Sequence, residues 1–213
     1  MAAYDDYEQG ERVREWIRQN GLSVVIGIVA GLVLIFGYRY WEQSRDQKKF
    51  EAATQYSMIE NYVYSDKLDE ARALLDSLED NHEKSAYTVF ANMLLARKEL
   101  DSDKPEAALK LLEKAVDLAT NSQLKDVARI RLARVQAAQE QPDAALKTLD
   151  QVDASRFTAL VSELRADMLA RTDKPQEAVK YYRQALEAYE QRSPQYEILQ
   201  MKLNSLPQAH TNS

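Results

Sequence analysis

The chain has 213 residues, of which 45% are hydrophobic and 29% are charged. Its 34 acidic and 28 basic residues give a net charge of −6, so nothing in the composition favours a nucleic-acid partner. The sequence has no cysteine, which excludes disulfide bonds and thiol chemistry but leaves the cellular compartment open.

An uncharged window near the N-terminus predicts a membrane-spanning helix. Residues 19–38 carry no charge and are bracketed by Arg18 and Arg39. At about 1.5 Å per helical residue, twenty residues cover the roughly 30 Å hydrocarbon core of a bilayer. The two tryptophans of the chain, Trp16 and Trp41, lie just outside this window, where indole rings suit the membrane interfaces.

Two other interpretations of the window fit its sequence less well. A buried helix of a soluble domain would carry polar residues at most turns, whereas Ser23 alone is polar between Leu22 and Phe36. A cleaved signal peptide has an apolar region of about 7 to 15 residues followed by a small-residue cleavage site. This run is longer and ends in aromatic and basic residues, so we expect it to remain as an anchor.

Gly27 and Gly31 form a GxxxG pair inside the window. Two glycines four residues apart share one helix face and allow a second helix to approach closely. Glycine is also common in membrane helices, so a neutral packing role is as well supported as homodimerisation or docking onto a partner's helix. Gly21 and Gly37 do not extend the stripe cleanly, which argues against a long helix interface.

The rest of the chain contains no glycine. All five glycines lie at or before Gly37, which leaves 176 residues without one. Hairpin turns, bulges and strained loops draw heavily on glycine. The composition therefore argues against a sheet domain or a nucleotide-binding loop and predicts helices joined by short connections.

Four related segments recur in this glycine-free part. They begin at Leu68, Pro105, Pro142 and Pro175, which are 37, 37 and 33 residues apart. This period is typical of helix-turn-helix solenoids of the tetratricopeptide kind, whose unit is about 34 residues. Each segment carries a signature alanine followed by further residues of one helix face four and seven positions later. The signature alanines are Ala71, Ala108, Ala145 and Ala178.

A first helix is expected upstream of each of these second helices. Twelve positions before the signature alanine, the last three units have a small residue where the two helices would cross, namely Ala96, Ala133 and Ala166. The first unit has Ile59 there. Terminal repeats are expected to be atypical, so we interpret the first unit as the membrane-proximal cap.

The sequence also marks where helices begin. Proline is tolerated at the first position of three second helices, because its missing N–H would be unpaired there. Asp103 and Asp173 lie just upstream and are expected to cap two of them. A C-terminal capping helix should begin at Ser193 and Pro194, a serine N-cap followed by proline.

The predicted fold is all-α, with a single transmembrane helix followed by a tetratricopeptide-like right-handed α-solenoid of about four helix pairs and a C-terminal capping helix. A long helix should run from about residue 11 towards residue 62. Helix pairs are expected at 83–100 with 104–119, 123–139 with 142–151, and 156–171 with 174–191. The predicted domain boundaries are 1–18 for an N-terminal tail, 19–41 for the transmembrane helix, 42–206 for the repeat domain and 207–213 for a disordered tail.

The segments resemble a tetratricopeptide array, and together with the span the whole chain resembles one family. The glycine-punctuated span that ends in Tyr38-Arg39-Tyr40-Trp41, followed by divergent repeats, is similar to the YfgM family, the ancillary subunit of the bacterial Sec translocon. The resemblance implies an inner-membrane protein with a periplasmic repeat domain. It also implies association with the translocon and a membrane-anchored periplasmic prolyl isomerase, and help in passing exported client proteins to chaperones.

The register of the repeats predicts a concave groove lined by the first helices. With the signature alanine as the twentieth position of a unit, the expected groove residues are Tyr56, Glu60, Tyr64, Phe90, Met93, Arg97, Val127, Ile130, Arg134, Glu163 and Asp167. The middle of this groove would be apolar with arginines beside it, which suits a hydrophobic segment of a partner or an unfolded client. With the register off by one, the apolar residues would instead belong to the core, and both interpretations stay open. The Lys and Asn residues that clamp a C-terminal carboxylate in other tetratricopeptide domains are missing.

Catalysis finds little support in the sequence. His82 falls in an expected connection and His210 in the C-terminal tail, and neither has a metal-spaced partner such as HExxH. Acidic runs on amphipathic helices are most often solvated faces. We therefore expect no enzymatic activity, no cofactor and no metal site.

Charge alone hardly sets the orientation in the membrane. Basic residues flank the span on both sides, at Arg12, Arg14 and Arg18 before it and at Arg39, Arg45, Lys48 and Lys49 after it. The positive-inside rule is weak where a long domain follows the span. The family resemblance leads us to expect a cytoplasmic N-terminus and a periplasmic C-terminal domain. A scaffold for another envelope assembly complex remains the alternative to an interaction module at the translocon.

Overall fold

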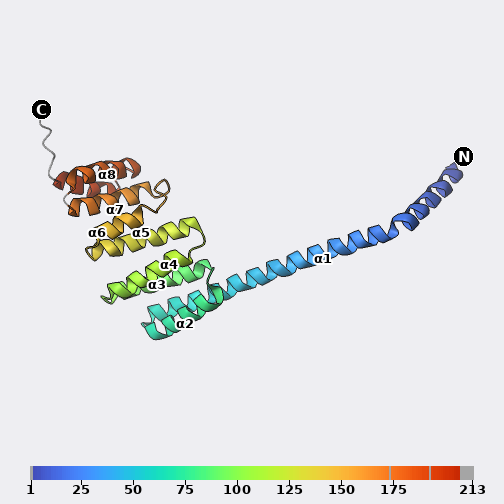
Figure 1. The fold of residues 1–213 in the computed structure, drawn as a ribbon, viewed down its shortest axis with the longest axis horizontal. Coiled ribbons are helices and arrows are strands. Elements are labelled where there is room, and N and C mark those ends of the chain that lie inside the picture. Colours follow the sequence, from blue (N-terminus) through green and yellow to red (C-terminus); the bar gives the residue numbers. More distant parts are fainter. Residues whose placement is uncertain (1, 173, 192, 207–213) are drawn as a thin grey trace, which may run out of the picture. The chain divides into compact units, whose positions relative to one another are not determined.

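The structure is a computed structural model, and it describes residues 2–172, 174–191 and 193–206. These residues form nine α-helices and no β-strand, which confirms the all-α prediction (Figure 1). The helices are α1 (Ala2–Tyr64), α2 (Leu68–His82), α3 (Ala86–Asp101), α4 (Pro105–Leu118), α5 (Ser122–Ala138), α6 (Pro142–Leu149), α7 (Thr158–Arg171), α8 (Pro175–Ala188) and α9 (Pro194–Ser205). The tail expected at 207–213 lies outside the described residues.

The chain divides into two compact units, Met1–Glu51 and Ala52–Ser213. The first unit is the N-terminal part of α1, which begins at Ala2, earlier than the sequence predicted. Among the described residues, α1 is the one helix long and apolar enough to cross a membrane, and its apolar window lies near the N-terminus. None of that window is buried against other parts of the protein.

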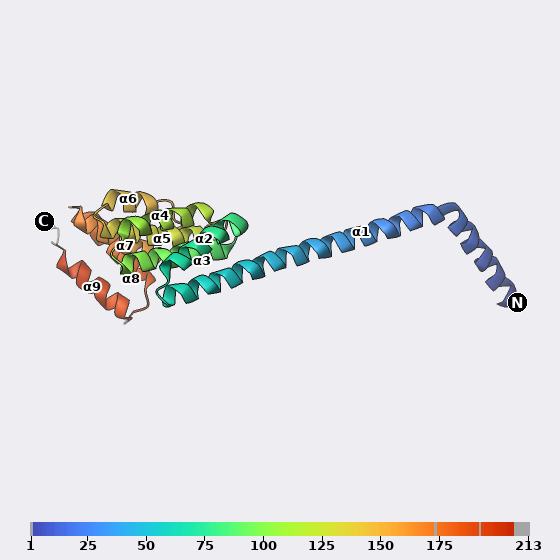
Figure 2. The ribbon, with the colours of Figure 1, turned by 90° about the horizontal axis from the view of Figure 1, so that it is seen from below.

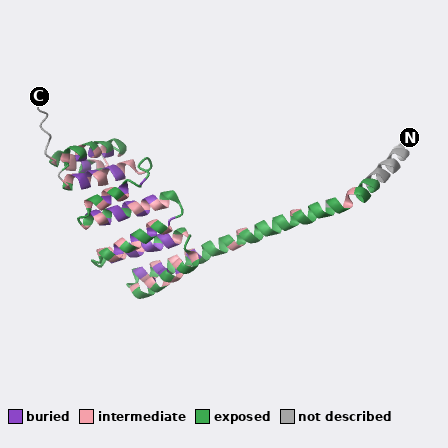
Figure 3. Cartoon of the chain, viewed as in Figure 1, coloured by how far each residue is buried: buried purple, intermediate pink, exposed green. Residues whose placement is uncertain are grey.

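Exposure of the apolar window distinguishes it from a core helix (Figure 3). The exposed large side chains include Leu22, Ile28, Leu34 and Phe36. A helix with apolar side chains on every side has no face suited to water, whereas a bilayer can surround it. At the end of this segment, the guanidinium of Arg45 lies 4.9 Å from the centre of the Trp41 ring, a cation–π arrangement suited to an interface.

The second unit stacks its helices as pairs in chain order (Figure 1). The last turns of α1 pair with α2, and buried Ala52, Ile59 and Val63 share a cluster with Leu75 and Leu78. The following pairs are α3 with α4, α5 with α6, and α7 with α8. All four signature alanines are fully buried, which lets the helices approach closely and confirms the predicted repeat register.

Buried polar groups join the first two pairs. Glu99 of α3 is almost completely buried, and its carboxylate accepts hydrogen bonds from the Arg72 guanidinium of α2. The Asn92 side chain of α3 donates to Glu79 of α2 over 2.8 Å, and Glu79 also pairs with Lys114 of α4. These contacts join α2 to α3 and α4. Removal of one partner would leave a buried polar group unpaired and would lower the stability of the protein.

The helix ends confirm one predicted cap and correct another. The Tyr196 N–H donates to the Ser193 hydroxyl over 3.2 Å, so Ser193 caps α9 as expected. Asp103 does not cap α4, because the residue before that helix is Lys104, which makes no side-chain capping bond. The second expected cap, Asp173, lies outside the described residues.

Asp103 instead belongs to a turn that ends a first helix. Asp66, Asp103 and Glu140 occupy corresponding positions in three units and have φ of 60°, 56° and 57°. In each turn the next N–H donates to the carbonyl five residues earlier, over 2.9, 2.8 and 2.9 Å, as in a Schellman motif. Glycine usually fills this left-handed position. This glycine-free domain uses acidic residues there.

Candidate partner-binding face

Helices α1 and α3 carry three aromatic rings in mutual contact. The Tyr56 ring centre lies 5.8 Å from that of Tyr87 and 6.2 Å from that of Phe90, and the Tyr87 and Phe90 centres are 6.2 Å apart. We name Tyr56, Tyr87 and Phe90 the aromatic patch. Tyr56 and Tyr87 are partly buried against the core, whereas Phe90 is 38% exposed, so Phe90 is the ring of the patch that a ligand could reach.

The phenol of Tyr56 connects the aromatic patch to α5. Burial, followed by the hydrogen bond with Glu60 and the negative charge of Glu60, raises the pKa of Tyr56 to about 12. The positive charge of Arg131 on α5 opposes this shift in pKa. Ring contacts join α1 to α3, and α3 is in contact with α5, so these three helices contribute to one surface.

Two arginines of α5 extend this surface away from the aromatic patch. Val127, Arg131 and Arg134 are spaced four and three residues apart, which places them on one side of the helix. Arg131 and Arg134 are exposed and form no ion pair within the part of the chain that the structure describes. By contrast, Arg97 of α3 pairs with Asp101 over 3.1 Å. We name the aromatic patch together with Glu60, Tyr64, Arg97, Val127, Arg131 and Arg134 the first-helix face.

The predicted acidic groove residues are occupied from within the chain. The Lys202 ammonium of α9 lies 3.0 Å from Glu163 and 2.8 Å from Asp167, both on α7. The hydroxyl of Tyr182 donates to Asp167 over 2.6 Å, and that of Tyr189 donates to Glu163 over 3.2 Å. Glu163 and Asp167 are partly buried, and Lys202 balances one of their two negative charges. Helix α9, which carries Lys202, packs against α8 (Figure 2).

The same cluster shifts the pKa of its tyrosines and lysine. Burial raises the pKa of Tyr182 and of Tyr189, and the neighbouring carboxylates add to the effect. Burial alone would lower the pKa of Lys202, but its hydrogen bonds with Asp167 and Glu163 raise it. Arg134 lies close enough to lower the pKa of Tyr189, so the first-helix face continues from α5 towards this cluster.

Two apolar residues expected in the groove belong to the core instead. Met93 is 5% exposed and packs in the cluster that joins α3, α4 and α5, and Ile130 is 3% exposed and packs against Val161. Val127 is partly buried. The exposed stripe expected of these side chains is therefore wrong at Met93 and Ile130.

Helix geometry explains this correction. Each residue of an α-helix is rotated by about 100° from the last, so a residue three positions on lies about 60° away from the first. Met93 is turned away from exposed Phe90 by this amount, and Ile130 is turned away from Val127. The exposed residue on the side of Val127 is Arg131, four positions further on, and the predicted groove did not include it. Tyr87, three residues before Phe90, is turned by the same amount to the other side of Phe90, where it meets Tyr56, and was not among the predicted residues.

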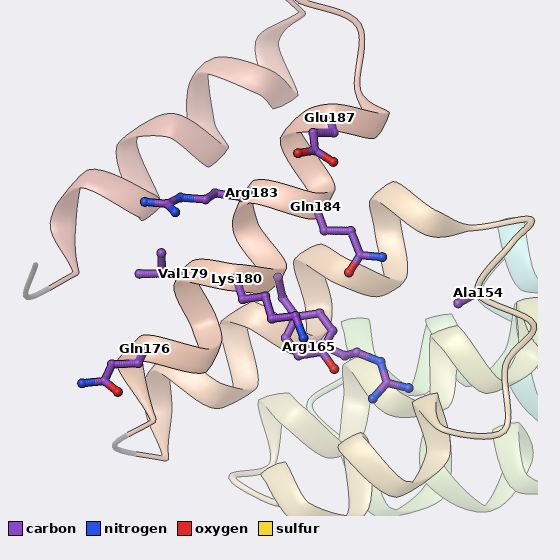
Figure 4. Close-up of a pocket in the computed structure, with 9 residues that line it drawn as sticks. Ala154, Arg165, Gln176, Val179, Lys180, Arg183, Gln184 and Glu187 are labelled. Atoms are coloured by element: carbon purple, nitrogen blue, oxygen red, sulfur yellow. The ribbon is translucent and has the colours of Figure 1, made fainter. Parts of the chain in front are cut away.

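A hollow of about 900 Å³ lies beside α8, and none of the predicted groove residues lines it (Figure 4). The connection through Ala154, which follows the 8-residue helix α6, and the side of α8 border it. The cation at its base is already paired, because Arg165 lies 2.6 Å from Asp150 and 5.9 Å from the Tyr181 ring. The other residues that line it are Gln176, Val179, Lys180, Arg183, Gln184 and Glu187.

The remaining candidate residues bring no catalytic arrangement together. Among the described residues, no group of three or more His, Asp and Glu side chains is placed to hold a metal ion. His82 ends α2, where its carbonyl accepts a hydrogen bond from Thr88, and His210 lies outside the described residues. An added Cβ at Gly27 or Gly31 would meet no atom within 4 Å, so their role in helix packing stays a prediction.

Known proteins support the predicted relationship. A family model described as a tetratricopeptide repeat-like domain matches residues 14–208. A protein of Haemophilus influenzae named ancillary SecYEG translocon subunit is 29% identical over 98 residues, which cover 45% of this chain and 48% of that protein. The match thus spans about half the length of this curated relative. The expected similarity to the ancillary translocon subunit is confirmed, and the extent of the family match shows that the chain belongs to the tetratricopeptide repeat-like domain family.

Proposed function

We propose that this protein is a non-enzymatic, membrane-tethered interaction module that associates with the Sec translocon and helps to pass exported proteins to periplasmic chaperones. The observation that carries the proposal is the similarity to a protein named as an ancillary SecYEG translocon subunit. A tetratricopeptide-like solenoid with an open first-helix face supports an interaction role, because side chains on its exposed side remain available to a partner.

The first-helix face is the proposed partner-binding surface. It retains the predicted residues Tyr56, Glu60, Tyr64, Phe90, Arg97, Val127 and Arg134, and it adds Tyr87 and Arg131. Aromatic and arginine side chains are enriched where protein interfaces derive most of their binding energy. Glu163 and Asp167 are left out of the open part of this surface because Lys202 already pairs with them.

The apolar window of α1 is the proposed membrane anchor, with the N-terminus in the cytoplasm and the repeat domain in the periplasm. Alkaline phosphatase fused after Leu206 should be active, because this enzyme needs export. A fluorescent protein that matures only in the cytoplasm should stay dark at the same position. Activity patterns with the opposite sign would remove the periplasmic orientation but would leave the repeat fold intact.

Copurification from detergent extracts tests the translocon association directly. Affinity-tagged full-length protein should recover translocon subunits and a membrane-anchored prolyl isomerase, and an unrelated single-span protein at equal expression is the control. Recovery of a different envelope complex without translocon subunits would support the scaffold alternative. Homodimerisation through Gly27 and Gly31 is tested in the same extracts, since Gly27→Ile with Gly31→Ile should abolish any recovery of a second, differently tagged copy.

A further inference from the structure

We infer that α1 carries a binding site for an anionic phospholipid headgroup just beyond its apolar window, formed by Trp41, Arg45 and Lys48. We name these three residues the headgroup cluster. They follow one another at four and three residues and therefore lie on one side of the helix. The inference rests on the proposed membrane anchor, because lipid phosphates surround the cluster only if the apolar window spans a bilayer.

The side chain of Arg45 folds back along the helix onto the indole of Trp41. Its guanidinium carbon lies 4.9 Å from the centre of the Trp41 ring, and the Tyr38 ring lies against the same indole with its centre 6.1 Å away. A cation–π contact holds the charge in place without neutralising it, because the ring has no net charge. The N–H donors of the guanidinium remain suited to two oxygens of one phosphate.

The charge of Arg45 lies at the depth of the lipid headgroups when the uncharged window 19–38 fills the hydrocarbon core. A bilayer is about 40 to 45 Å thick around a core of about 30 Å, so each headgroup layer is roughly 5 to 7 Å deep. Trp41 follows Tyr38 by three residues, or about 4.5 Å along the helix axis. Because Arg45 reaches back to Trp41, its guanidinium lies in this layer although its backbone is about 6 Å further out.

The helix segment that follows the window has an excess of positive charge. Positions 39 to 49 hold four basic residues, Arg39, Arg45, Lys48 and Lys49, and two acidic residues, Glu42 and Asp46, which gives a net charge of +2. The next acid, Glu51, lowers the net charge to +1, but it lies six residues beyond Arg45, about 9 Å further along the axis. An anion beside Arg45 therefore meets a positive surface.

The acids of this segment lie beside the headgroup cluster and not within it. At about 100° per residue, Trp41 and Lys48 lie on one side of Arg45, and both acids lie on the other. A carboxylate oxygen of Asp46 lies 3.4 Å from the Lys49 ammonium and 3.9 Å from Arg45 Nε, and the second distance is too long for a hydrogen bond. Lys48 forms no ion pair among the residues that the structure describes. Arg45 and Lys48 are thus both available to one phosphate.

The headgroup cluster should prefer lipids with a net negative headgroup to zwitterionic lipids. A zwitterionic headgroup carries its own ammonium next to the phosphate, and Arg45 and Lys48 would repel this ammonium. Basic residues near an anionic membrane surface each contribute to binding, and the effect falls off within a Debye length. The bilayer also holds its phosphates at the depth of the cluster, so a lipid phosphate has a higher effective concentration there than phosphate in solution.

The test places the full-length Trp16→Phe variant in lipid nanodiscs, so that Trp41 is the one tryptophan of the chain. Bromine atoms on a lipid acyl chain quench tryptophan fluorescence on contact. Brominated phosphatidylglycerol and brominated phosphatidylcholine are compared at equal mole fraction in a background of phosphatidylcholine. The quenching should show phosphatidylglycerol enriched about fivefold around Trp41. Glycerol 1-phosphate added in solution should not displace it.

Matched variants in the same background identify the residues responsible. Arg45→Gln should lower the enrichment below about twofold, because it removes the charge and the paired donors together. Arg45→Lys keeps the charge but loses the two-pronged geometry, so its enrichment should be intermediate. Arg39→Gln makes the same change in charge on another side of the helix and should leave the enrichment above about threefold. Each enrichment compares two lipids within one variant, so a change in the intrinsic fluorescence of Trp41 cancels.

The outcomes separate this inference from the proposed anchor. Absence of quenching by both brominated lipids would overturn the anchor and the inference together. Equal quenching by the two lipids would leave the anchor standing and overturn the inference. Equal losses in Arg45→Gln and Arg39→Gln would also overturn it, because a diffuse attraction would then replace a site. Displacement of phosphatidylglycerol by glycerol 1-phosphate would overturn the lipid as the source of the phosphate.

Discussion

The ammonium of Lys202 lies 2.8 Å from the carboxylate of Asp167, and this contact ties the last described helix, α9, to α7. Lys202→Met keeps most of the side-chain length but leaves Asp167 and Glu163 without their cation. The contact is partly exposed to solvent, so we expect a local loss of about 1 to 2 kcal/mol.

Hydrogen exchange of the full-length protein measures this loss where it occurs. Amides of α9 should exchange roughly 5 to 30 times faster in Lys202→Met, since about 1.4 kcal/mol corresponds to a factor of ten. Lys180→Met on the exposed side of α8 is the matched control and should leave α9 unchanged. Uniform acceleration across α2 to α9 would show that the contact stabilises the whole domain and not α9 alone.

Phe90 and Ile130 should respond differently to truncation. Ile130→Ala removes a nearly buried side chain and should lower the free energy of unfolding by about 2 to 4 kcal/mol through cavity formation. Phe90→Ala removes a side chain that is 38% exposed and should cost less than about 1.5 kcal/mol. Urea unfolding followed by circular dichroism compares them. A larger cost for Phe90 would return it to the core and remove the exposed aromatic patch.

Alkaline pH should destabilise the repeat unit. The pKa of Tyr56 is raised from 10.0 to about 12 in the folded protein, chiefly by burial, and those of Tyr182, Tyr189 and Lys202 are also raised. Groups whose folded pKa is raised hold protons more tightly when folded. Their contribution is therefore complete below pH 10 and is lost as the pH rises through the folded pKa.

The free energy of unfolding should accordingly fall between about pH 10 and pH 12. Tyr56→Phe removes one of the titrating groups, so its stability should decline less steeply over the same interval. Urea titrations at a series of pH values measure both slopes. A stability that rises with pH in this interval would contradict the assigned environments of these tyrosines.

Glycine at the left-handed turn after α5 should stabilise the protein. Glu140 has φ of 57°, a conformation that costs a residue with a side chain about 1 to 2 kcal/mol and costs glycine little. Glycine also makes the unfolded chain more flexible, so the net gain of Glu140→Gly should be about 0.5 to 1 kcal/mol. Gln141→Gly, at φ of −111°, is the control and should be destabilising.

The repeat architecture was predictable because local signals agreed with one another. Period, proline positions and signature alanines all indicated the same helix pairs, and Ser193 with Pro194 marked the start of α9. The exception at the helix ends was Asp103. An aspartate before a proline-initiated helix is a common N-cap, but the same residue also tolerates left-handed backbone, and the length of the turn decides between these roles.

The side-chain composition of the candidate site was less predictable. Helical spacing places residues on one side of a helix but does not decide which of them are exposed. Phe90 and Met93 are three positions apart on one predicted face, yet Phe90 is exposed and Met93 is buried. The pairing of Lys202 with Glu163 joins residues 39 positions apart, and nothing in either sequence segment indicates it. Contacts of this kind depend on how α9 packs, which the repeat pattern does not describe.

The short helix α6, with 8 residues, affects how firmly neighbouring helix pairs of the repeat unit are held together. In a stacked array each pair is held only by its neighbours, so the array is as strong as its weakest junction. The buried cluster through α6 has five residues, Ala133, Ala137, Ala145, Leu149 and Met168, whereas the cluster that joins α3, α4 and α5 has ten. Ile130, Val152 and Val161 form a further small cluster across the α6 junction, so this junction is held by two small buried clusters where α3, α4 and α5 share one large one. The arginines of α5 and the acidic cluster under α9 lie on opposite sides of that junction, so a partner that contacted both would hold it closed.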